Sequence, residues 1–309
     1  MAAWLVPLAG CGPAIAPVDT PPARPNLVLI CIDTLRADAL GSYGYDRATA
    51  PTIDRLAAAG VRFERAFAAS TYTRESVAAL LTGRLPVRAG HGWQARPNPE
   101  LPNLARSLKE AGYRTYFASD HPALRAPPYT DGLGFDRALH MSERYHSGRA
   151  DALVNRAMPF LNDAPGEPFL LYLHFLDPHA PYRPSGAAQA AVVPDTPTGG
   201  PGFMTVRQGF AEYAAAGFGP GTPEFEAMRA RYDAEIRDVD GAIATLLDAF
   251  DEAGLTEHTI FLITADHGEE FMEHGFIDHS WTLYNEVLHV PFIVYAPGRV
   301  VPGVVEAPA

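Results

Sequence analysis

Residues 26–32 read NLVLICI, a continuous apolar run that ends at Asp33. Such a run predicts a short strand buried on both faces, and Cys31 inside it is expected to be a packed core thiol. Residues 169–176 (FLLYLHFL) and 259–264 (TIFLIT) have the same character. Helical patterns alternate with these strands. The order predicts an α/β fold with a mostly parallel central sheet flanked by helices.

Apolar spacing marks the alternating helices. Residues 51–60 begin with proline and end with glycine, and residues 224–253 carry one long apolar stripe closed by Gly254. Residues 119–144 are expected to be irregular. Residues 184–222 show no clear period and read as a surface excursion with a short helix around 210–215. The remaining expected elements are helices at 75–81, 104–111 and 150–161, and strands at 61–68, 114–118 and 291–295.

Composition excludes several classes of protein. The chain has 309 residues, 47% of them hydrophobic, and a net charge of -12. Disorder requires far less apolar content, and a nucleic-acid backbone binder requires clustered cations, so no nucleic-acid partner is expected. The only lysine is Lys109, in a predicted amphipathic helix. Two cysteines are too few for a disulfide scaffold, and no apolar run reaches the roughly 18 residues of a membrane span.

Residues 1–25 read as a lipoprotein-type signal and a Pro/Ala-rich tether rather than as part of the catalytic domain at 26–309. Leu8-Ala9-Gly10-Cys11 resembles the lipobox of a bacterial lipoprotein, which predicts lipidation of Cys11. The expected location is the bacterial cell envelope, as a periplasmic or outer-membrane lipoprotein that meets the membrane only through this anchor. The alternative is a disordered tail with a chance match.

Polar side chains follow the predicted strands. Asp33 follows the first strand, Asp266 and His267 follow the strand at 259–264, and Thr73 stands just before the helix at 75–81. Carboxyl ends of parallel strands share one sheet edge, so these side chains could converge there. Oxygens with one imidazole suit a divalent ion such as Ca, Mn, Mg or Zn. An aspartate after a strand, or Thr73 before a helix, can also be only a cap or turn residue.

Five segments together resemble the sulfatase family of the alkaline-phosphatase superfamily, and they occur in that family's order. They are PNLVLICIDTLRADALGSYGY, TYTRESVAALLTGR, FLLYLHFLDPHAPY, YDAEIRDVDGAIATLLDAF and TIFLITADHGEEFMEHG. The resemblance implies a divalent metal bound by Asp33, Thr73, Asp266 and His267, with Thr73 as nucleophile. It implies a leaving-group role for His179 and a substrate-binding role for His279 and His274. His179 could instead be a loop histidine beside prolines, and the other two could be solvated loop residues.

The resemblance also implies a longer chain. After VPFIVYAPGRV the family continues into a C-terminal subdomain, which is apparently missing from these 309 residues. The expected catalytic domain is therefore truncated at its C-terminus.

Departures from the family pattern bear on the substrate. Sulfatases oxidise a Cys or Ser nucleophile to formylglycine, whereas Thr73 already bears a methyl on its β-carbon, so no formylglycine is expected. The family's catalytic lysines are absent, and Ala118-Ser119-Asp120-His121 replaces G-K-W-H. This pattern resembles threonine-type members and favours phosphoester or phosphodiester substrates, carried by a small anionic ester, a glycan or a lipid headgroup. Alternatives are a true sulfuric ester hydrolase, an envelope phospho-headgroup transferase and an inactive anion- or glycan-binding lipoprotein.

Overall fold

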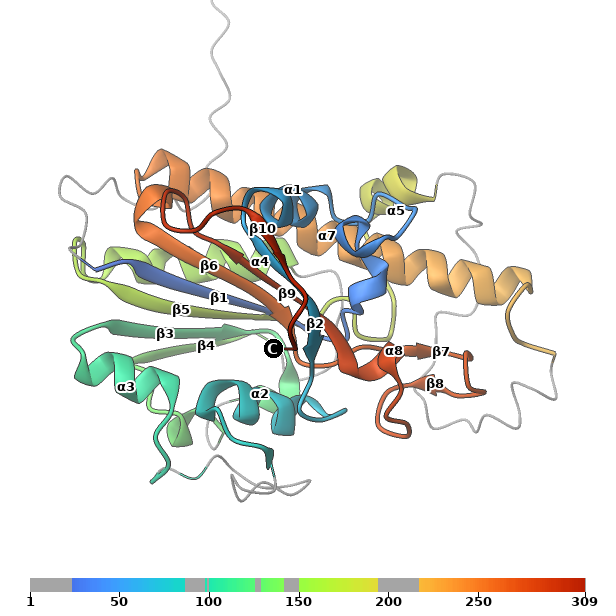
Figure 1. Ribbon diagram of the computed structural model, residues 1–309, viewed down its shortest axis with the longest axis horizontal. Coiled ribbons are helices and arrows are strands. Elements are labelled where there is room, and N and C mark those ends of the chain that lie inside the picture. Colours follow the sequence, from blue (N-terminus) through green and yellow to red (C-terminus); the bar gives the residue numbers. More distant parts are fainter. Residues whose placement is uncertain are drawn as a thin grey trace, which may run out of the picture.

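The computed structural model describes residues 24–86, 98, 100–125, 129–141, 150–193 and 217–308. An eight-stranded sheet forms the centre, in the order β10-β2-β9-β6-β1-β5-β3-β4 (Figure 1). Strand β9 pairs antiparallel with β2 and β6, and every other pair is parallel. The strands are β1 (Asn26–Ile32), β2 (Val61–Phe67), β3 (Arg114–Ser119), β4 (Arg137–His140), β5 (Phe169–Phe175), β6 (Thr259–Ala265), β9 (His289–Tyr295) and β10 (Gly303–Val305).

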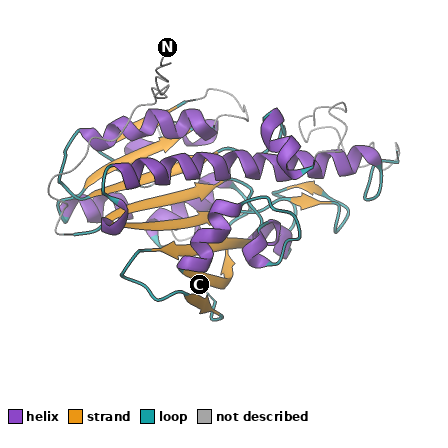
Figure 2. Cartoon of the chain, turned by 90° about the horizontal axis from the view of Figure 1, so that it is seen from above, coloured by secondary structure: helices purple, strands orange, loops and turns teal. Residues whose placement is uncertain are grey.

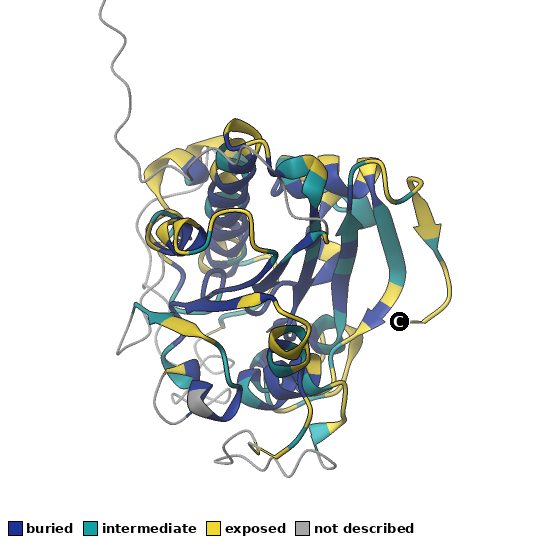
Figure 3. Ribbon diagram, turned by 90° about the vertical axis from the view of Figure 1, so that its left-hand side faces the viewer, coloured by how far each residue is buried: buried dark blue, intermediate teal, exposed yellow. Residues whose placement is uncertain are grey.

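Helices cover the two faces of this sheet unequally. One face carries α1 (Pro51–Ala59), α4 (Ala150–Ala157) and the long α7 (Pro223–Glu252), and α5 (Gly186–Val192) lies against α7 (Figures 1 and 2). The other face carries α2 (Thr73–Thr82) and α3 (Leu104–Glu110). The central strands β1 and β5 are therefore buried on both faces, as Figure 3 shows.

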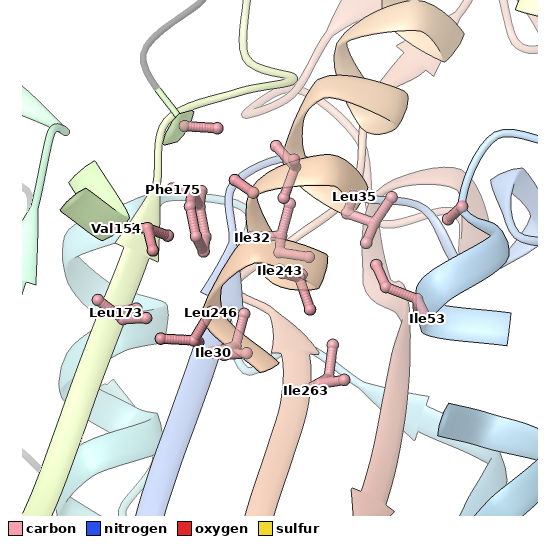
Figure 4. Close-up of a cluster of buried hydrophobic side chains, with 14 of the residues drawn as sticks. Ile30, Ile32, Leu35, Ile53, Val154, Leu173, Phe175, Ile243, Leu246 and Ile263 are labelled. Atoms are coloured by element: carbon pink, nitrogen blue, oxygen red, sulfur yellow. The ribbon is translucent and has the colours of Figure 1, made fainter. Parts of the chain in front are cut away.

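The main core lies between the sheet and α7. Ile243 and Leu246 of α7 meet Ile30 of β1 and Ile263 of β6 in one fully buried cluster (Figure 4). Burying one such side chain stabilises the fold by about 1.5–3 kcal/mol. Helix α7 also caps a neighbour, because the carboxylate of Asp240 accepts backbone N–H bonds from the first turn of α1. One side chain of α7 thus fixes the start of its neighbour α1 on the same face of the sheet.

Most predicted elements are confirmed, and four segments differ. The helix expected at 150–161 ends at Ala157 and is followed by a 3-10 turn, η6 (Met158–Asn162). The structure places an edge strand, β4, within residues 119–144, which were expected to be irregular. This short strand pairs only with β3, so it does not need the continuous apolar run that marks a central strand. Residues 184–222 hold α5, whose first turn is capped when Ser185 Oγ accepts the Ala188 N–H bond. The helix expected at 210–215 lies outside the described residues. Helix α2 begins at Thr73 rather than after it.

Short elements complete the chain. Strands β7 (Glu270–Phe271) and β8 (Ile277–Asp278) form a small antiparallel pair, and α8 is Asn285–Leu288. Among the described residues no helix is long and apolar enough to span a bilayer. The 3-10 turns are η1 (Ala37–Ala39), η2 (Gly41–Tyr43), η4 (Pro122–Leu124), η5 (Thr130–Gly132), η6 (Met158–Asn162) and η7 (Thr256–His258).

Candidate active site

Strand register brings the predicted carboxylates together. Ile32 of β1 lies opposite Ala265 of β6, so Asp33 and Asp266 leave the sheet side by side at its carboxyl edge. Both side chains are buried, with 0% and 2% exposure. His267 follows Asp266 and is fully buried. The parallel pairing of two apolar strands therefore places two carboxylates and an imidazole at one point.

Helix α2 presents Thr73 to this point. Tyr72 is the N-cap residue and makes no side-chain cap bond, and Thr73 is the first helical residue. Thr73 Oγ1 lies 3.4 Å from His267 Nε2. The local backbone bonds are made by other hydroxyls: Ser70 Oγ accepts from Tyr72 N, and Ser76 Oγ donates to the Ser70 carbonyl. The Thr73 hydroxyl is thus directed toward the site and does not cap the helix.

The donor set around Asp33 fits a divalent cation. Both Asp33 carboxylate oxygens and Asp266 Oδ2 are buried without a hydrogen-bond partner, although imidazole nitrogens lie nearby. His267 Nε2 is 3.6 Å from Asp33 Oδ1 and 3.5 Å from Asp266 Oδ2. Unpaired buried carboxylates are costly, and a bound cation removes that cost. We call Asp33, His174, Asp266 and His267 the metal cluster.

The tautomer of His267 suits a metal ligand. Its Nδ1 lies 3.0 Å from the Gly268 carbonyl, which can only accept, so Nδ1 carries the proton. The neutral ring then directs the Nε2 lone pair toward Asp33, Asp266 and Thr73. A backbone carbonyl fixing the second ring nitrogen is a common arrangement for histidine ligands. Burial, opposed by Asp266, lowers the pKa of His267 to about 4, which keeps the ring neutral at pH 7.

Burial and the neighbouring carboxylate of Asp266 raise the pKa of Asp33 well above its ordinary value. This shift belongs to the metal-free protein, in which two acids share one buried space. A cation at the same place reverses the balance, because it favours the charged carboxylate.

The site predicted from the sequence did not include two histidines that lie near Asp33 in the structure. His174 of β5 has its Nε2 3.6 Å from Asp33 Oδ2, and together with Asp266 it completes a grouping of ligand atoms within 4.8 Å. Its sequence signal is one polar residue inside the otherwise apolar run FLLYLHF. His121 Nε2 lies 3.2 Å from the same Asp33 oxygen, and its Nδ1 accepts from Ala123 N. With Nδ1 accepting, the neutral ring carries its proton on Nε2, the nitrogen nearest this Asp33 oxygen.

A second cluster, which we call the rim cluster, consists of Glu269, Asp278 and His279. His279 Nδ1 lies 2.8 Å from Asp278 Oδ1 and 3.2 Å from Glu269 Oε1. Tyr182 donates its hydroxyl to Glu269 Oε2 at 3.1 Å. Although burial lowers it, the two carboxylates together raise the pKa of His279 well above its usual value. These acids are paired within the protein, unlike those of the metal cluster.

A pocket of about 540 Å³ opens beside Thr73, lined also by His121, His179 and His279. His179 Nδ1 lies 2.6 Å from the Ala180 carbonyl, so the neutral ring turns the Nε2 lone pair away from that carbonyl. Burial and the nearby charge of His279 lower the pKa of His179 to about 4. The rings of His179 and His279 meet edge to face at 5.1 Å. Thr73, His179 and His279 thus share one pocket.

Other predicted residues lie elsewhere. His274 stacks on Tyr284 with ring centres 3.5 Å apart, pairs with Glu286, and does not line the pocket. Cys11 lies outside the described residues. Cys31 is fully buried and free, as expected of a core thiol. Lys109 lies on α3 and pairs with Asp136, away from the pocket lining.

Comparison with known proteins decides the family. The family model described as Sulfatase matches residues 25–309. The chain belongs to the sulfatase family. It is 28% identical over 319 residues to an arylsulfatase of Hemicentrotus pulcherrimus, covering 92% of this chain and 56% of that protein. It is 26% identical over 340 residues to the human iduronate 2-sulfatase, covering 89% and 60%. The chain thus spans somewhat more than half the length of these relatives.

Solved structures show the same fold. The phosphonate monoester hydrolase of Agrobacterium radiobacter aligns with a TM-score of 0.72 and 21% identity, over 92% of this chain and 70% of that one. A protein solved with its substrate D-glucosamine-2-N,6-O-disulfate aligns with a TM-score of 0.75 and 19% identity, over 92% and 74%. Sulfatase-family members typically use a divalent metal, and the described residues include acidic and histidine groupings able to hold one.

Proposed function

We propose that this protein is a metal-dependent hydrolase of anionic esters, with Thr73 as nucleophile and phosphoesters or phosphodiesters as preferred substrates. One observation supports this most strongly: the Thr73 hydroxyl meets His267 Nε2 beside buried carboxylate oxygens that have no hydrogen-bond partner. A hydroxyl that only caps a helix or packs in the core does not require unpaired buried carboxylates beside it. Family membership of the whole matched region supports the same reaction class.

Asp33, Asp266, His267 and Thr73 would hold the metal, with His174 near enough to join them. When bound, the metal supplies Lewis-acid stabilisation of negative charge and lowers the pKa of a hydroxyl beside it. The start of α2 adds partial positive charge from its free N–H groups, which favours an anionic group next to Thr73.

The proposed reaction has two in-line displacements. Thr73 Oγ forms a bond to phosphorus as the bond to the leaving oxygen breaks, which leaves a phosphothreonine and an alcohol or phenol. Water then attacks phosphorus, and the bond to Thr73 Oγ breaks to free the hydroxyl, which gives phosphate from a monoester substrate or a phosphate monoester from a diester. Each displacement needs one group that takes a proton and one that gives it.

The hydrogen bonds of the two histidines support one as proton acceptor and the other as proton donor. His179 presents a lone pair at Nε2, because its Nδ1 proton faces the Ala180 carbonyl, so it is suited to take a proton from the attacking water. His279 has two carboxylates on Nδ1, so it is suited to remain charged and to donate from Nε2 to the leaving oxygen. We therefore propose His279 as donor and His179 as acceptor.

The preference for phosphoesters over sulfate esters rests on two departures from the family pattern. Thr73 cannot form the formylglycine aldehyde, and the family's catalytic lysines are absent. A threonine attacks directly, and the described residues that line the pocket include one Arg and no Lys. The comparison proteins include sulfatases as well as a phosphonate monoester hydrolase, so both ester types belong in the test. A true sulfuric ester hydrolase, a headgroup transferase and a binding-only protein give different results there.

The test compares wild type, Thr73→Ala and Thr73→Ser on matched aryl phosphate, phosphodiester and sulfate esters. Thr73→Ala should lose at least about 10³-fold in kcat, and Thr73→Ser should retain measurable activity. Mass spectrometry of acid-quenched enzyme should find one phosphoryl group on Thr73. Sulfate turnover ten times faster than the phosphoesters would reverse the preference. Equal activity of wild type and Thr73→Ala would show that Thr73 is not the nucleophile.

We also propose that the protein is anchored in the bacterial envelope through Cys11, on the evidence of Leu8-Ala9-Gly10-Cys11 alone. The partners then expected are glycans or lipid headgroups that carry an anionic ester. Metabolic labelling with a palmitate analogue should mark the wild type and not Cys11→Ser. Label on both proteins, or on neither, contradicts the anchor.

A further inference from the structure

Among the described residues that line the pocket, Arg74 is the only lysine or arginine. It directly follows Thr73 and occupies the first turn of α2. A cation there opposes the helix macrodipole and costs the helix about 0.3–1 kcal/mol. A residue that weakens its own helix beside a proposed nucleophile is a candidate for a functional role.

The structure holds Arg74 in a defined position. Its Nε donates to the Ala123 carbonyl at 2.8 Å, and Ala123 also lines the pocket. Its own carbonyl accepts from the Tyr129 hydroxyl at 2.8 Å. Both the side chain and the backbone are therefore tied to the segment that follows β3. Such fixing reduces the entropy lost when a ligand binds.

The charge of Arg74 has no counter-ion among the residues that the structure describes. No carboxylate in the described part of the chain forms an ion pair with it, and the adjacent Glu75, which lines the same pocket, does not pair with it. At least five other described arginines do have one. The pairs are Arg36 with Asp38 and Glu273, Arg47 with Asp233, Arg62 with Glu64, Arg114 with Glu167, and Arg137 with Asp163.

We propose that Arg74 binds the tetrahedral oxyanion of the substrate, phosphate or sulfate, through its guanidinium Nη groups. This inference rests on the proposed function, because it concerns the same pocket. Nε is bonded to Ala123, which leaves the two Nη groups to donate to oxygen. Arg74 thereby supplies, from the residue after the nucleophile, the positive charge that the absent lysines would otherwise provide.

The experiment measures binding of inorganic phosphate and of sulfate to the metal-loaded protein by calorimetry, at equal metal content. Arg74→Gln should weaken binding of the preferred anion roughly 10- to 100-fold, which is the range of a charge-assisted hydrogen-bond pair. Arg74→Lys should recover part of this loss, because it keeps the charge without the fork. Arg55→Gln, on the exposed side of α1, is the matched control and should bind as wild type does.

The same titration is repeated in a Thr73→Ala background, which separates this proposal from the proposed reaction. If no ester is turned over but Arg74→Gln still weakens anion binding, the reaction fails and the Arg74 assignment stands. If Arg74→Gln binds both anions as tightly as Arg55→Gln does, the Arg74 assignment is wrong whatever the activity. A loss in kcat/KM that falls mainly on KM for the aryl esters supports a binding role.

Discussion

The metal cluster and the rim cluster contain the same types of side chain, carboxylates and histidines, but they differ in how their oxygens are hydrogen-bonded. Each brings carboxylates and histidine within 4.8 Å. In the metal cluster, Asp33 and Asp266 keep buried oxygens without a hydrogen-bond partner. In the rim cluster, Glu269 is bonded by both His279 and Tyr182. Proximity alone therefore does not define a metal site; unsatisfied ligand atoms do.

This difference in hydrogen bonding follows from the elements that carry each cluster. The ligand atoms of the metal cluster come from residues that directly follow β1 and β6 and from the penultimate residue of β5, so the paired strands fix their backbone positions. The rim cluster lies on the loops and the small β7–β8 pair beyond the sheet, where its side chains are hydrogen-bonded or paired with one another. A rigid frame can hold like charges together until a cation binds.

The largest effect should come from the metal cluster. Asp33→Asn removes the charge that faces His121, His174 and His267, so metal content should fall to background and kcat by at least about 10²–10³-fold. Because an unpaired buried charge is lost, the metal-free variant should unfold at no lower temperature than the metal-free wild type. Elemental analysis and thermal melts with chelator measure both.

Asp278→Asn is the matched control for that prediction, since it removes one carboxylate from the rim cluster. It should keep full metal content. If Asp278→Asn also loses the metal, or if Asp33→Asn keeps it, the distinction between the two clusters is wrong.

An intermediate effect is expected from Glu269→Gln. The amide keeps the size of the side chain but no longer holds the His279 Nδ1–H with a charge, so kcat should fall about 10- to 100-fold, in the range known for residues that orient an active group. Metal content should not change. Tyr182→Phe removes only the hydroxyl bond to the other Glu269 oxygen and should cost less than about 10-fold.

Loss of metal in Glu269→Gln would show that the rim cluster also contributes to cation binding. Unchanged kcat would show that Asp278 alone holds His279 in place.

Sequence reasoning reached the parts of this site that lie directly after strands. Asp33 and Asp266 follow apolar runs, and the carboxyl ends of parallel strands share one edge, so their meeting could be predicted. The outer elements could not be predicted. The edge strand β4 has no apolar run because it is paired on one side only, and α5 is formed from small residues without an apolar stripe.

The remaining site residues depend on contacts between distant segments. His174 and His121 meet Asp33 only because β5 lies beside β1 and β3 beside β5. Arg74 looks like an ordinary helix residue in sequence, and its lack of a carboxylate partner is visible only in three dimensions. Register along one strand can be predicted from a pattern, but which loops face each other across the sheet edge cannot.

The smallest effect concerns the loop that joins the two clusters. Arg36 donates to the Glu269 carbonyl at 3.1 Å and pairs with Glu273, so it holds the segment between His267 and the β7–β8 pair. Although burial raises it, the attraction and hydrogen bond of Arg36 lower the pKa of Glu273 below its ordinary value. Glu273→Gln should destabilise the metal-free fold by about 1–2 kcal/mol at pH 7, because Asp38 still pairs with Arg36.

The sign of the pH dependence follows from the lowered pKa. Glu273 contributes stability above the pKa it has when unfolded, and this contribution disappears as the pH falls through its folded value. Urea unfolding of wild type and Glu273→Gln with chelator present should therefore show a gap that narrows from pH 7 to about pH 3. A gap of constant size would mean that the glutamate acts by packing and not by charge, and that the loop between the two clusters is not held electrostatically.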